Sequence, residues 1–152
     1  MPRPTAEILA DVKRLAVEYY LATGKPLGVT GEIAEAEVGR LLGLDLLEAR
    51  SPGYDALRRV GDRVETIQIK GRWKRQGRDW GRVPSINTDQ PFDVVMLVLM
   101  QGDYEVFEIW QASREAVVGR LDLPGSRARN ERRAMAVAQF KAIATQIWPT
   151  GG

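Results

Sequence analysis

A two-strand hairpin is the feature that most constrains the fold of this chain. Residues 54–70 form two stretches suited to strands, separated by Gly61-Asp62, a pair typical of a two-residue turn with glycine first. With this turn, Val60 lies opposite Arg63, and the pairing of every other residue follows by counting. A four-residue loop centred on the same pair would keep this register, whereas a three-residue loop would shift it.

The register brings three polar side chains to one face of the hairpin. Counting back from the turn places Asp55 opposite Gln68, and directly opposed residues point to the same face with Cβ atoms about 5 Å apart. Lys70 lies two residues beyond Gln68, so it points to that face as well. Mg²⁺ prefers oxygen ligands and substrate phosphate oxygens, and a neighbouring lysine can stabilise developing negative charge. We therefore expect metal-assisted phosphodiester hydrolysis at this face.

At these residues the sequence resembles the PD-(D/E)XK nuclease superfamily, whose signature is an acidic residue on one strand and (D/E)-x-K on the next. Here the signature would be Asp55 followed by Gln68-Ile69-Lys70, with Tyr54 in place of the proline and glutamine in place of the second acid. Some members, including endonuclease subunits of certain cut-and-paste transposases, tolerate this glutamine because its carbonyl oxygen can still bind metal.

The resemblance implies a restriction-endonuclease-like α/β fold with an α-β-β-β-α-β core, in which helices flank a mixed central sheet. It implies a metal-dependent endodeoxyribonuclease that uses Mg²⁺ or Mn²⁺. Asp55 would bind the metal directly, and Gln68 would bind through its side-chain carbonyl. The backbone carbonyl of Ile69 would add another oxygen, and Lys70 would orient the nucleophilic water and stabilise negative charge.

A helix before the hairpin supplies a further acidic candidate. Residues 30–42 predict a helix that Thr30 caps and Gly43 ends. At about 100° per residue its buried stripe consists of Ala34, Val38, Leu41 and Leu42. Glu35 lies at the edge of that stripe, Glu32 points nearly away, and Glu37 flanks the other edge. Many superfamily members take an additional acidic ligand from their first core helix, so the resemblance assigns this role to Glu35, with Glu32 in reserve. The alternative is three solvated glutamates.

A segment rich in basic and aromatic residues follows the hairpin. Residues 72–90 predict a loop, and a loop of this length is itself typical of a functional segment. It includes Arg72, Trp73, Lys74, Arg75, Arg78, Trp80 and Arg82. Arginine and lysine can neutralise phosphates, and tryptophan can stack on an unpaired base or wedge at a groove. The alternative is a solvated loop whose tryptophans pack on the core. A second basic cluster, formed by Arg129, Arg132 and Arg133, could hold more phosphate backbone or simply begin an exposed helix.

Periodicity and turn residues predict the remaining elements. We expect helices at 5–21, 113–120 and 128–148, and strands at 44–50, 92–100 and 104–110. Thr5 would cap the helix at 5–21, and Ser113 would cap the helix at 113–120. The strongly apolar strand at 92–100 would be central and buried on both faces.

Composition narrows the class of protein. With 152 residues the chain fits one domain spanning 1–152. The absence of histidine excludes His-metal nuclease sites and Ser-His-Asp chemistry, and the absence of cysteine excludes thiolate metal sites. No apolar run reaches the length of about 20 residues needed to cross a bilayer, and no signal-peptide pattern is present. We therefore expect a cytoplasmic protein with no membrane partner.

Three functions are compatible with these observations. The first is the metal-dependent nuclease acting on DNA. The second is a catalytically weak or inactive nucleic-acid-binding module, which the glutamine at Gln68 and the small net charge of +2 would favour. The third is an interaction or immunity protein that binds no nucleic acid. No residue pattern distinguishes DNA from RNA, and cutting both strands of a duplex with one site per chain would favour a homodimer.

Overall fold

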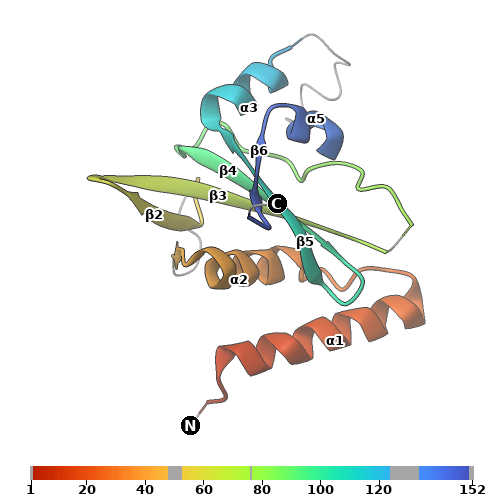
Figure 1. Ribbon diagram of the computed structural model, residues 1–152. Helices are drawn as coiled ribbons and strands as arrows, with labels where there is room; N and C mark the ends of the chain where they lie inside the picture. The colour runs from red at the N-terminus through yellow and green to blue at the C-terminus, as the bar shows by residue number, and fades with distance from the viewer. Residues whose placement is uncertain (1, 48–52, 76, 124–133, 151–152) are drawn as a thin grey trace.

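The computed structural model describes residues 2–47, 53–75, 77–123 and 134–150. The elements follow in the order α1 (Thr5–Thr23), α2 (Thr30–Leu42), β1 (Asp45–Leu46), β2 (Ala56–Val60), β3 (Arg63–Lys74), β4 (Val94–Gln101), β5 (Glu105–Ser113), α3 (Arg114–Leu121), α5 (Val137–Ala142) and β6 (Thr145–Trp148). The strands form one sheet in the order β1-β2-β3-β4-β5-β6 (Figure 1). β3 and β4 are parallel and the other neighbours are antiparallel. The expected α/β class and mixed sheet are confirmed.

The sheet separates two apolar cores. α1 and α2 cover one face, and α3 and α5 lie on the other (Figure 1). Side chains of β4 alternate between the two: Val94, Met96, Val98 and Met100 join the first core, whereas Val95, Leu97 and Leu99 join the second. All seven are buried. The prediction of a central strand buried on both faces is therefore confirmed.

The hairpin has the predicted register. Val60 pairs with Arg63 and Ala56 pairs with Ile67 across the turn. Asp55 lies just before β2, and its N–H donates to the carbonyl of Ile67 at 2.7 Å. Beyond Ile67, β3 continues to its end with β4 on one side, and no described strand pairs with its other side. The two strands of the hairpin therefore separate at Asp55 and leave one edge of β3 open.

The prediction that residues 72–90 form a loop is wrong at its beginning, because β3 extends to Lys74. Pairing with β4 continues as far as Lys74 opposite Gln101, which supplies ladder hydrogen bonds to these residues. Gly71 allows α2 to pack directly against the strand, since a Cβ there would lie 2.5 Å from the Cβ of Ala34. This tertiary packing outweighs the glycine-rich local pattern.

The predicted helix at 128–148 is also wrong within the described residues. Helix α5 is short, and strand β6 follows it antiparallel to β5. Val137 and Phe140 pack in the core beneath α3, whereas Ile147 and Trp148 pack on the opposite face of the sheet. One straight helix cannot reach both faces, and β6 also satisfies the edge of β5.

Two of the three predicted N-caps are wrong. Thr5 and Thr30 are the first helical residues, with Pro4 and Val29 as N-caps and no side-chain cap. Ser113 caps α3 as predicted, because its Oγ accepts the N–H of Ala116 at 3.1 Å. The strand expected at 44–50 is only Asp45–Leu46 in the described part, and residues 48–50 lie outside it.

The connection between β3 and β4 departs from the expected α-β-β-β-α-β order. Described residues 77–93 contain no helix there, so irregular chain makes the crossover between these parallel strands. Among the described residues, no helix has the length and apolar character needed to span a membrane.

Candidate active site

Asp55 occupies the point where β2 and β3 separate. Its Oδ2 accepts the N–H of Ile69 at 2.8 Å, which satisfies the first donor on the open edge of β3. The N–H and C=O of one strand residue point to the same side, so the carbonyl of Ile69 faces the same opening. A carboxylate and a main-chain carbonyl are thereby brought to one edge of the sheet.

Glu35 reaches this edge from α2. A hydrogen bond joins its carboxyl group to that of Asp55, and Lys70 is a further charged neighbour. Burial, followed by the negative charge of Asp55, raises the pKa of Glu35 from 4.5 to about 7. Glu32 on the same helix is exposed. Of the two glutamates considered from the sequence, Glu35 is therefore the one beside Asp55.

Gln68 is buried beneath the site, with 5% of its surface exposed. Its Nε2 donates to the carbonyl of Gly53 at 2.9 Å, which fixes the orientation of the amide. Its Oε1 is buried and has no hydrogen-bond partner among the described residues. A buried acceptor without a protein partner usually binds a water molecule or an ion, so Oε1 is available as an oxygen ligand.

Lys70 follows on the same strand and is half-buried. Burial lowers the pKa of its ammonium group below 10.5, while the carboxylates of Asp55 and Glu35 act in the opposite direction. Lys70 therefore interacts electrostatically with both carboxylates and also lines an open groove.

These donors fit a hard divalent cation. Two carboxylates, an amide oxygen and a main-chain carbonyl are the ligand types that Mg²⁺ and Mn²⁺ take in proteins. The described residues contain no group of three or more acidic, histidine or cysteine side chains placed to hold a metal. A metal bound here would therefore have only two carboxylate ligands, and neutral oxygens would supply the others. The unpartnered Oε1 of Gln68 is suited to that role.

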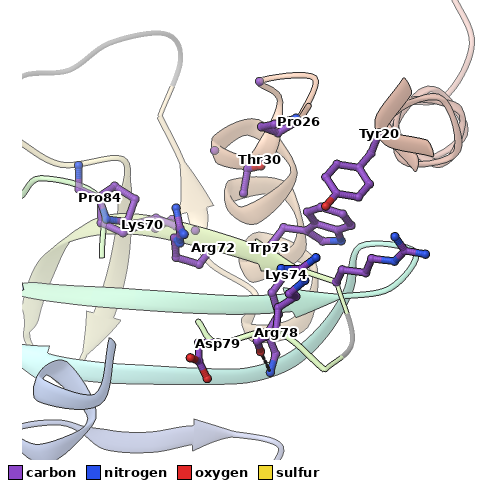
Figure 2. A pocket seen from close by; sticks show the side chains of 15 residues that line it. Tyr20, Pro26, Thr30, Lys70, Arg72, Trp73, Lys74, Arg78, Asp79 and Pro84 are labelled. Carbon is purple, nitrogen blue, oxygen red and sulfur yellow. Dashed lines mark hydrogen bonds between the residues drawn. The ribbon is translucent and has the colours of Figure 1, made fainter. Parts of the chain in front are cut away.

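A basic groove of about 700 Å³ begins at Ile69 and Lys70 and follows the second half of β3 (Figure 2). Its cationic lining residues are Lys70, Arg72, Lys74, Arg75 and Arg78, and its acidic one is Asp79. Five of the predicted nucleic-acid-binding residues, four of them basic and the fifth Trp73, thus line the groove with Lys70. The carboxylate pair and the basic residues are therefore neighbours on one surface.

Both tryptophans of the basic segment pack on the protein. Trp73 stacks on Tyr104 with ring centroids 4.9 Å apart, and its Nε1 donates to the carbonyl of Gly102. Trp80 lies under the ammonium group of Lys74 and outside the groove lining. This arrangement matches the alternative in which the tryptophans pack back on the core.

The remaining predicted residues are Arg82 and the three arginines of the second basic cluster. Arg82 forms an isolated bridge with Ala136 and is absent from the groove lining. Arg129, Arg132 and Arg133 lie outside the described residues.

Two parts of the site were not predicted from the sequence. The carbonyl of Gly53 orients Gln68, and no local pattern indicates this contact. The α1–α2 connection and the start of α2 form one wall of the groove through Pro26, Gly28 and Thr30. Only the packing of α2 on β3 brings this wall to the site.

Comparison with protein-family models gives no match to this sequence, and comparison with curated proteins gives none either.

Replacing Glu35 by glutamine should stabilise the metal-free protein at alkaline pH. The folded pKa of about 7 lies above the ordinary value of 4.5, so the folded chain binds more protons between these values. The wild type therefore loses stability as pH rises from about 4.5 through 7. Solvent screening at this half-buried position reduces the expected gain of Glu35→Gln to about 1–2 kcal/mol above pH 7.

Urea denaturation in EDTA between pH 4 and 8 measures this effect, with Glu32→Gln on the exposed side of the same helix as the control. The gain should disappear below the ordinary glutamate pKa. Equal stability of Glu35→Gln and wild type at pH 8 would contradict the assigned environment of Glu35.

Proposed function

We propose that this chain is a metal-dependent endodeoxyribonuclease with a restriction-endonuclease-like core. One observation carries the proposal: the carboxyl groups of Glu35 and Asp55 meet where β2 and β3 separate, and both interact electrostatically with Lys70. Gln68, with its unpartnered Oε1, precedes Lys70 by two residues on β3. This set supplies oxygen ligands for one divalent cation and a cation of its own for the substrate phosphate.

Each residue of the site would have a role that follows from its chemistry. Asp55 and Glu35 would hold Mg²⁺ or Mn²⁺ together with Gln68 and the carbonyl of Ile69. The bound ion would polarise a phosphate and favour ionisation of an attacking water. Lys70 would donate to the nucleophile or to a phosphate oxygen and stabilise the negative charge that develops there. Its position between the carboxylates and the groove suits both roles.

The arrangement of elements supports the finer fold assignment in part. Helix α2 precedes three antiparallel strands, and β4 then lies parallel to β3, which agrees with the first four elements and the last strand of the expected core. The irregular crossover replaces the second helix of that core. The proposal therefore rests on the site more than on the order of elements.

Gln68 favours one alternative function. An amide at this position leaves the site with two carboxylates, so metal affinity would be lower than in a site with three. The alternative is a nucleic-acid-binding module that retains the fold and lacks cleavage. It would show salt-dependent binding without metal-dependent cutting.

Replacing Lys70 by alanine should reduce cleavage about 10²- to 10³-fold, the typical effect of removing one donor that stabilises transition-state charge. The assay uses supercoiled, linear and single-stranded DNA with Mg²⁺ or Mn²⁺. Lys141→Ala is the matched control, because Lys141 is also half-buried and lies beside a carboxylate, that of Glu108, at 2.9 Å. Cleavage by Lys70→Ala at the rate of Lys141→Ala would refute the proposed role.

A further inference from the structure

The groove that leads away from the candidate site differs from its surroundings in charge. Arg72, Lys74, Arg75 and Arg78 line it. In the described part of the chain, none of the four forms an ion pair with a carboxylate. Asp79 is the one acidic residue in the lining. The groove therefore presents positive charge that the protein itself leaves uncompensated.

Neutral acceptors hold two of these cations in place. Nε of Arg72 donates to the carbonyl of Trp80 at 3.2 Å, and Nζ of Lys74 donates to the carbonyl of Arg78 at 2.8 Å. These bonds fasten the irregular segment after β3 against the strand and keep the two charges at fixed positions. A site with fixed charges loses little side-chain entropy when an anion binds.

The cations follow the direction of β3. Lys70, Arg72 and Lys74 are two residues apart along the strand, so their side chains point to the same face. The Cα atoms of successive members are about 6.6 Å apart. Figure 2 shows the three in succession along β3. From Lys70 to Lys74 the row covers about 13 Å. A linear polyanion, with charges at repeated intervals, matches this row better than a single compact anion does.

The groove is small compared with a duplex. Its volume of about 700 Å³ is that of a pocket for one small molecule, comparable to one or two nucleotides. Pro26 of the α1–α2 connection and Thr30 of α2 form one wall, and the chain after β3, including Arg78 and Pro84, forms the other (Figure 2). Tyr20 adds an aromatic surface next to Trp73. A cationic groove with aromatic walls is typical of sites for unpaired strands.

We infer that the groove binds one unpaired nucleic-acid strand along β3, with Arg75 and Arg78 on the backbone a few nucleotides from Lys70. This inference deepens the proposed function, since it rests on the candidate site as the place of cleavage and names the unpaired strand as the substrate class. Unpaired DNA and unpaired RNA share the phosphodiester chemistry that the groove recognises.

Fluorescence anisotropy in EDTA tests the inference without any cleavage. The probes are a labelled DNA strand of about 20 nucleotides, an RNA strand of the same sequence, and the blunt DNA duplex. The wild type should bind one or both single strands at least about tenfold more tightly than the duplex, since only an unpaired strand enters the groove.

The double variant Arg75→Gln/Arg78→Gln should bind the single strand about tenfold or more weakly. The slope of log affinity against log salt should fall by about 1.4, which corresponds to two phosphate contacts on a single strand. The matched control is Arg59→Gln/Arg63→Gln, because these arginines are also exposed and lie in β2 and β3 beside the turn of the hairpin, away from the groove.

Duplex binding as tight as single-strand binding would overturn the inference, as would equal losses in the two double variants. Because every arm is measured in EDTA, these outcomes are independent of whether the protein cleaves. Only the cleavage assay can refute the nuclease proposal. Failure of the single-strand inference and failure of the nuclease proposal are therefore distinguishable.

Discussion

Asp55→Asn should lower divalent-cation affinity and DNA cleavage by at least about a hundredfold each, since a metal ion contributes several kcal/mol of transition-state stabilisation. The substituted amide keeps an oxygen that can accept the N–H of Ile69, which Asp55 now binds at 2.8 Å. The change therefore removes a charge from the site while leaving the local backbone contact. Calorimetric titration with Mn²⁺ and cleavage of single-stranded and supercoiled DNA measure the two effects.

The control for this variant is Asp93→Asn. Asp93 also binds strand backbone through its carboxylate, since its Oδ2 accepts the N–H of Thr66 at 2.8 Å, and it lies outside the groove. We expect Asp93→Asn to retain metal binding and cleavage. Unchanged Mn²⁺ affinity in Asp55→Asn would show that Asp55 is not a metal ligand.

Gly71→Ala should destabilise the protein by about 3 kcal/mol, at the upper end of the usual cost of overpacking a core. An added Cβ would lie 2.5 Å from the Cβ of Ala34 and 3.3 Å from the carbonyl oxygen of Thr30. Neither atom is the end of a flexible side chain, so α2 must move away from β3. Because α2 carries Glu35, cleavage should fall as well. Urea denaturation at pH 7 measures the change in stability.

The control removes the methyl group of Ala34, on the α2 side of the contact, in the protein that carries the new methyl group at position 71 of β3. Ala34→Gly removes the clashing atom and by itself costs about 1 kcal/mol of helix propensity. The double variant Gly71→Ala/Ala34→Gly should therefore recover about 2 kcal/mol relative to Gly71→Ala. If the double variant is less stable than Gly71→Ala, the destabilisation does not arise from this contact.

Local rules were sufficient for the hairpin and for the convergence at its base. The Gly61-Asp62 turn determines that Val60 pairs with Arg63, and the alternation of the strands then brings Asp55, Gln68 and Lys70 to one place. Helical periodicity likewise placed Glu35 at the edge of the buried stripe of α2. The apolar run of β4 indicated a strand buried on both faces, which requires no knowledge of its partners.

Tertiary packing determined what the sequence could not indicate. Trp73 belongs to β3 because β4 continues beside it and Tyr104 stacks on its ring. The chain after Ala142 becomes β6 because β5 offers an unpaired edge there. Neither partner is close in sequence, so local propensity gave a loop in one case and a helix in the other.

The orientation of Gln68 illustrates the same limit within the site. Its alternation with Ile67 and Ile69 predicted the face of the strand, but the carbonyl of Gly53 binds Nε2 and so decides which atom of the amide is left without a partner. That contact spans fifteen residues and depends on the path of the chain before β2. The sequence therefore indicated which residues meet, and the structure adds which of their atoms remain without partners.

The most direct test of the proposed metal-dependent site is cleavage of circular single-stranded DNA by the wild-type protein after removal of metal with EDTA. We predict no cleavage in EDTA and cleavage once excess Mg²⁺ or Mn²⁺ is added. Cleavage that persists in EDTA would contradict the proposed metal site of Glu35, Asp55 and Gln68. No cleavage at any metal concentration would contradict the nuclease, and salt-dependent binding of the same strand would then favour the binding module.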